Sequence, residues 1–118
     1  MNYNQNKRIM QINEQTLIIG VDIAKERHVA RAQDFRGIEY GKTLYFSNDN
    51  KGFIELYNWF NKLCAEHAKT NVIVGMEPTG HYWFCLAKFL RQKGIKIAIV
   101  NPMHVKKVKS LMITLQQK

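Results

Sequence analysis

The chain has 118 residues, of which 46% are hydrophobic, so it suits one domain with a single core and leaves no room for a second full domain. Its 18 Lys and Arg residues against 9 Asp and Glu residues give a formal net charge of +9 at pH 7. An excess of this size usually indicates a polyanionic partner such as nucleic acid, although an inert basic surface would also produce it. No apolar run reaches membrane-spanning length, and the first fifteen residues lack the apolar core of a signal peptide, so we expect a cytoplasmic protein with no membrane partner.

The first half of the chain predicts a flexible leader followed by three strands. Residues 1–15 are polar and amide-rich, which is typical of a loose terminus. The apolar run at 16–23 predicts a strand buried on both faces, and the alternating or β-branched runs at 28–33 and 38–47 predict two more. Because only short turns join the three strands, we expect an antiparallel meander.

The second half predicts helices that alternate with apolar strands. Capping side chains at Ser47 to Asn50 precede a stripe of aromatic and aliphatic residues at helical spacing. Thr79 is a candidate N-cap for a second helix, which Gly94 ends, and Asn101-Pro102 begins a last helix. The expected helices cover about residues 50–67 and 79–93 and start again at 102, and the expected strands cover about residues 71–77 and 96–100.

Two carboxylates end the two most apolar runs in the same way. Asp22 follows Gly20 by two residues, and Glu77 follows Gly75 by two, so each acid shares a strand face with a glycine that leaves room for a ligand. In parallel neighbouring strands, about 4.8 Å apart, both acids would reach one metal ion. Converging carboxylates hold the cations of two-metal phosphodiester cleavage, and they suit Mg²⁺. The alternative is a turn-capping Asp22 and a Glu77 that merely precedes a proline turn.

Basic and aromatic residues lie close to both acids in the sequence. The basic residues after Asp22 and on the last helix are placed to hold phosphate groups. The histidine and tyrosine that follow Glu77 are placed to stack on a nucleotide or to hydrogen-bond to it. For the lysine run on the last helix, a solvated helix face is an equal alternative. The candidate nucleic-acid-binding residues are Lys25, Arg27, Arg31, His81, Tyr82, Lys106, Lys107 and Lys109.

The order of elements, β-β-β-α-β-α-β-α, is the plan of the ribonuclease H-like fold, an α/β fold whose mixed sheet has helices on both faces. By analogy with that fold, the first strand is central and the fourth pairs beside it, which puts Asp22 next to Glu77. A rival of another class is half of a sugar-kinase or actin-like ATPase domain. Such proteins need a glycine-rich phosphate turn after the first acid, and residues 24–27 contain no glycine. Saturable ATP binding would favour that rival.

Three blocks, Gly20–Lys25, Gly75–Trp83 and Val100–Lys109, resemble successive blocks of the DEDD transposases. These are the IS110 group of bacterial insertion sequences, related to the Piv/MooV DNA invertases. The resemblance implies a RuvC-like N-terminal transposase domain over residues 16–111, with 112–118 as a divergent tail. It also implies four acids that bind Mg²⁺ or Mn²⁺ for DNA transposition and recombination, of which Asp22 matches the first and Glu77 the second.

The chain departs from this family at the remaining two acids. An Asp-x-x-Asp pair is expected soon after the last helix begins, but the sequence after Leu111 contains no Asp, and the family's C-terminal domain with its serine nucleophile is absent. We therefore expect a truncated domain that binds metal weakly, binds DNA, and does not transpose DNA alone. The resemblance also implies an element-encoded guide RNA as a partner and leaves self-association open. The alternative is a non-catalytic nucleic-acid-binding remnant, whose binding would survive EDTA and Asp22→Ala.

Overall fold

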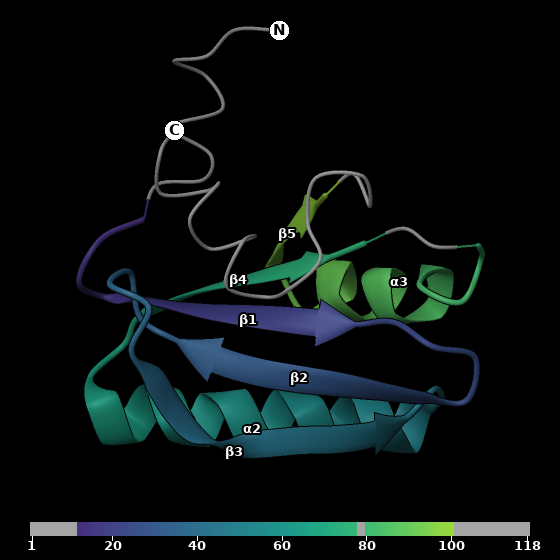
Figure 1. Ribbon diagram of the computed structural model, residues 1–118, viewed down its shortest axis with the longest axis horizontal. Helices are drawn as coiled ribbons and strands as arrows, with labels where there is room; N and C mark the ends of the chain where they lie inside the picture. Colours follow the sequence, from purple (N-terminus) through teal and green to yellow (C-terminus); the bar gives the residue numbers. More distant parts are fainter. Residues whose placement is uncertain (1–11, 78–79, 101–118) are drawn as a thin grey trace, which may run out of the picture.

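A computed structural model describes residues 12–77 and 80–100, which form a five-stranded mixed sheet with two helices (Figure 1). The strand order is β3-β2-β1-β4-β5. Strands β1 to β3 are antiparallel, whereas β4 and β5 run parallel to β1. The α/β class, the meander and the central first strand are therefore confirmed. The elements are β1 Thr16–Asp22, β2 Arg27–Gln33, β3 Glu39–Ser47, α2 Asn50–His67, β4 Asn71–Met76, α3 Phe84–Gln92 and β5 Lys96–Ile99.

Both described helices pack on the same face of the sheet. Leu17, Ile19 and Val21 of β1 alternate onto that face and join buried residues of α2 and α3 in one core cluster. The two helices also touch each other, since the ring centroids of Phe53 and Phe89 are 5.6 Å apart. The last helix, expected from residue 102, lies outside the described residues, so a helix on the opposite face stays a prediction.

Helix α2 begins where the sequence predicts. Asp49 is the N-cap, and its side chain accepts a hydrogen bond of 2.9 Å from the backbone N–H of Gly52. Gly52 is required here because a Cβ at this position would lie 2.0 Å from the carbonyl oxygen of Ser47. The chain therefore passes from β3 into α2 through a contact that only glycine allows.

Helix α3 is shorter than predicted, because it begins at Phe84 rather than near residue 79. Gly80 has a φ of +57°, a left-handed conformation that no helix interior accepts, and the indole N–H of Trp83 donates to the Gly80 carbonyl at 3.1 Å. These residues form a turn, and Thr79 lies outside the described residues.

Within the described ranges, no helix is long and apolar enough to cross a membrane.

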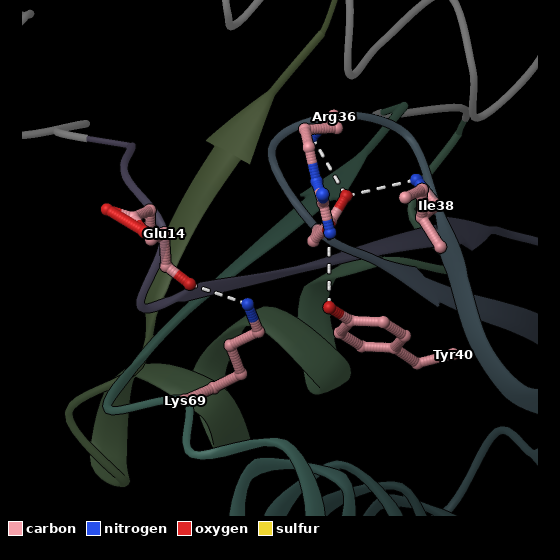
Figure 2. A network of polar contacts seen from close by, with 6 residues as sticks. Glu14, Arg36, Ile38, Tyr40 and Lys69 are labelled. Atoms are coloured by element: carbon pink, nitrogen blue, oxygen red, sulfur yellow. Dashed lines mark hydrogen bonds and ion pairs between the residues drawn. The ribbon is translucent and has the colours of Figure 1, made fainter.

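A buried carboxylate closes the turn between β2 and β3 at the end of the sheet where β1 begins. Asp34 is fully buried and accepts hydrogen bonds from the Ile38 backbone N–H at 3.0 Å, the Tyr40 hydroxyl at 3.2 Å and the Arg36 guanidinium at 2.8 Å. Figure 2 shows these donors beside Lys69, whose ammonium group donates to the backbone carbonyl of Glu14. The network ties the turn together at the opposite end of β1 from Asp22.

Candidate functional site

The two predicted acids lie side by side at the carboxyl ends of neighbouring parallel strands. Asp22 is the last residue of β1 and is exposed, and Glu77 directly follows β4 and is half-buried. The parallel register pairs Gly20 with Gly75 and Val21 with Met76, so Asp22 and Glu77 occupy the next position along both strands. Strand spacing puts their backbones about 4.8 Å apart. The geometry thus brings together the acids that the sequence singled out.

The glycines beneath the acids do not form the open approach expected from the sequence. Gly20 and Gly75 are paired and lie on the same face as Asp22 and Glu77, but both residues are buried. Ile18 and Ile73, one step further along, are fully buried as well. The acids are therefore open to solvent at the end of β1, where Asp22 is exposed, and not across the glycine pair.

A row of side chains crosses four strands on the face opposite α2 and α3. Antiparallel register pairs Asp22 with Val29 and Val29 with Tyr45, so the row runs Glu77, Asp22, Val29, Tyr45. Arg27 and Arg31 flank Val29 on the same strand at a spacing of two residues, and period-two alternation puts them on the same face. Both arginines are exposed. Positive charge therefore lies immediately beside the acid pair.

The loop between β1 and β2 is held from inside by two polar residues. The backbone N–H of Ala24 donates to Nδ1 of the buried His28 at 3.1 Å, and the Asn48 side-chain amide donates to the Lys25 carbonyl at 3.1 Å. The Asn48 backbone N–H donates to the carbonyl of Glu26 at 3.0 Å. These bonds fix the loop that follows Asp22 and carries the exposed Lys25.

His28 is neutral in this setting. Burial lowers its pKa below the ordinary value, against the opposing effects of the Asn48 side chain and the negative charge of Asp22. Because Nδ1 accepts a hydrogen bond, the ring proton lies on Nε2. Among the described residues, Nε2 of His28 and Oδ1 of Asn48 are buried atoms with no hydrogen-bond partner, and they are complementary as donor and acceptor. No motif in the sequence singles out His28, so its role in the loop follows from the structure alone.

The remaining predicted residues divide into two groups. His81 is exposed and Tyr82 is half-buried in the turn between Glu77 and α3, and their ring centroids are 4.5 Å apart. They come within a few residues of Glu77 in the chain, as expected. The lysines of the last predicted helix lie outside the described residues: Lys106, Lys107 and Lys109.

Two adjacent carboxylates suit a divalent cation, but they are an incomplete ligand set. In the part of the chain that the structure describes, no group of three or more His, Cys, Asp and Glu side chains is placed to hold a metal ion. All nine acids of the chain fall within that part. Further ligands to a cation at Asp22 and Glu77 would thus come from water, from substrate phosphate or from another polypeptide segment.

Comparisons with known proteins point to DNA recombination enzymes. Residues 19–118 match the family model of the IS110-type DEDD transposases, described as "Transposase". The pilin gene-inverting protein of Moraxella lacunata is 35% identical over 88 residues, and that of Moraxella bovis is 34% identical over 88 residues. Each alignment covers 74% of this chain and 26% of the relative. The chain therefore spans about a quarter of the length of the curated relatives it matches.

Solved structures give only a distant likeness. The ethanolamine utilization protein EutJ from Carboxydothermus hydrogenoformans aligns with a TM-score of 0.45 at 16% identity, over 75% of this chain and 38% of that chain. A Ppx/GppA family member from Aquifex aeolicus aligns with a TM-score of 0.42 at 11% identity, over 74% of this chain and 35% of that chain. Neither likeness bears on function.

Proposed function

Since the chain belongs to the IS110-type DEDD transposase family, we propose that it supplies the first two acids of a metal-dependent centre for DNA strand cleavage and transfer. The observation that carries the proposal is the placement of Asp22 and Glu77 at the same level of two adjacent parallel strands. The family membership favours this function over a sugar-kinase or actin-like ATPase. The proposal also includes DNA as the target and an element-encoded guide RNA as a partner.

In this proposal Asp22 and Glu77 hold Mg²⁺ or Mn²⁺ through carboxylate oxygens. A bound divalent cation would supply activation of water or hydroxyl and stabilisation of the leaving oxygen. The chain's own residues do the positioning: β1 and β4 fix the spacing of the acids, and His28 with Asn48 fixes the loop after Asp22. Lys25, Arg27 and Arg31 would hold the DNA backbone beside the acids.

The proposal predicts weak cation binding and no strand cleavage by this chain alone. Two carboxylates leave most of the coordination shell of Mg²⁺ to water, and poor positioning of the reacting groups costs orders of magnitude in rate. The measurement is Mn²⁺ titration followed by paramagnetic broadening of backbone amide signals in NMR spectra. Broadening should centre on residues 21–23 and 76–77 and disappear in Asp22→Asn and in Glu77→Gln.

The matched control is Glu55→Gln, which removes an exposed carboxylate from α2 in the opposite layer. It should leave the broadening at Asp22 unchanged. Broadening that is spread evenly over all exposed acids would contradict a cation site at this position. Mg²⁺-dependent cleavage of DNA by the purified chain, abolished by Asp22→Ala, would contradict the claim that the chain is inactive alone.

The second candidate is a domain that binds nucleic acid without metal. The observation that favours it is the lack of a third metal-ligating side chain beside the two acids in the described ranges. DNA binding that is unchanged by EDTA and by Asp22→Ala, with no Mn²⁺ broadening at the acid pair, would select this candidate. Loss of DNA affinity on removal of the cation would select the metal-dependent centre.

A further inference from the structure

Tyr45 lies in the same row as the acid pair but is not part of any core. The residue is 53% exposed, although β3 pairs with β2 and packs against α2. Two strand spacings separate it from Asp22, which is a distance of about 10 Å across the sheet. If the acid pair holds a phosphate of a DNA strand, a neighbouring nucleotide of that strand can reach the exposed ring at this distance.

The ring of Tyr45 is already engaged by a cation on one side. The guanidinium carbon of Arg27 lies 5.1 Å from the ring centroid, which is a cation–π arrangement. This contact holds the ring in a defined orientation and leaves the arginine exposed. Arg31, two strand positions beyond Val29, adds a second exposed positive charge on the same face. The surface therefore combines a ring for stacking with charges that complement a phosphodiester backbone.

We propose that Tyr45 is a stacking platform for an unpaired DNA base next to the acid pair, with Arg27 and Arg31 holding the adjoining phosphates. This inference rests on the proposed function and deepens it by assigning a subsite for a single strand. Flat exposed aromatic rings beside positive charge bind single strands through base stacking, which tolerates any sequence. The bases of an intact duplex present no free face to Tyr45, so the subsite takes strands that are already unpaired.

The test compares two single strands of equal length, at a fixed Mg²⁺ concentration and at fixed salt. One is an oligothymidylate and the other is an abasic deoxyribose-phosphate strand that carries the same charge without bases. Tyr45→Thr keeps the strand propensity of β3 but removes the ring, and Tyr45→Phe keeps the ring. Fluorescence anisotropy of labelled strands measures Kd for each protein.

Tyr45→Thr should weaken binding of the oligothymidylate by about 5- to 150-fold, and it should leave binding of the abasic strand unchanged. Tyr45→Phe should bind both strands like the parent chain. Arg27→Ala should weaken binding of both strands, because it removes a phosphate contact. The control Ile54→Ala removes an exposed apolar side chain from α2, in the other layer, and should change neither Kd.

Three results would overturn the inference. Equal weakening of both strands in Tyr45→Thr would show that the ring acts through structure or charge rather than stacking. An unchanged Kd for oligothymidylate in Tyr45→Thr would show that Tyr45 does not contact the bound strand. It would not contradict the role proposed for the acid pair. Failure of the parent chain to bind either strand would overturn the proposed DNA interaction and the subsite together.

Discussion

At the scale of single residues, His28 connects the sheet core to the loop after Asp22. His28→Leu keeps the apolar volume but leaves the Ala24 N–H without its acceptor, so the free energy of unfolding should fall by about 1–3 kcal/mol. Hydrogen exchange at the Ala24 amide should accelerate, whereas the amide of Ala30 in the same sheet should keep its protection relative to global stability. Unchanged exchange at Ala24 would show that His28 does not hold the loop.

The sequence predicted some of these residues and missed others for physical reasons. Asp22 and Glu77 could be singled out from the sequence because each ends a buried strand, and that pattern is local. Tyr45 could not be predicted, because its place in the row depends on how β2 pairs with β1 and with β3. His28 could not be predicted either, because its role depends on its burial and on the path of the loop that brings the Ala24 N–H to it. No periodicity within either strand reveals which residue of the neighbouring strand lies opposite.

At the scale of elements, the β2–β3 turn depends on Asp34 and should respond to acid. Burial raises the pKa of Asp34, but the hydrogen bonds from Arg36, Ile38 and Tyr40 outweigh this effect and hold the pKa below its ordinary value. The unfolded chain therefore binds a proton at this position at a higher pH than the folded chain. The resulting stability is present above about pH 4 and is lost as the pH falls through the lower, folded pKa.

Asp34→Asn should lower the free energy of unfolding at pH 7 by about 1–3 kcal/mol, because the charged acceptor is lost. It should also flatten the decline of stability below about pH 4. Chemical denaturation at several pH values measures both effects. Glu39→Gln removes an exposed carboxylate at the start of β3 and is the control. If the free energy of unfolding of both variants depends on pH as it does in the parent chain, Asp34 does not cause the loss of stability in acid.

Element boundaries were predictable where the local signal and the tertiary structure agree. Helix α2 begins at its predicted cap because Asp49 and Gly52 act locally. Helix α3 does not begin where predicted. The apolar spacing of Trp83 and Leu86 is helical, but Trp83 lies in a turn that the left-handed Gly80 begins. Glycine is permitted in several conformations, so its presence at 80 could not decide between a helix start and a separate turn.

At the scale of the whole molecule, the charge of +9 predicts DNA binding that weakens steeply with salt. If Lys25 and Arg31 each contact one phosphate, the double variant Lys25→Ala/Arg31→Ala should reduce the slope of log K against log salt by about 1.8 on duplex DNA. Affinity should fall on all sequences alike, because phosphate contacts carry no base information. Lys62→Ala removes an exposed charge from α2, on the layer away from the acid pair, and should leave the slope unchanged if DNA lies over the acids. Equal reductions per charge in both variants would instead indicate a diffuse basic surface, with no preferred path for DNA past Asp22 and Glu77.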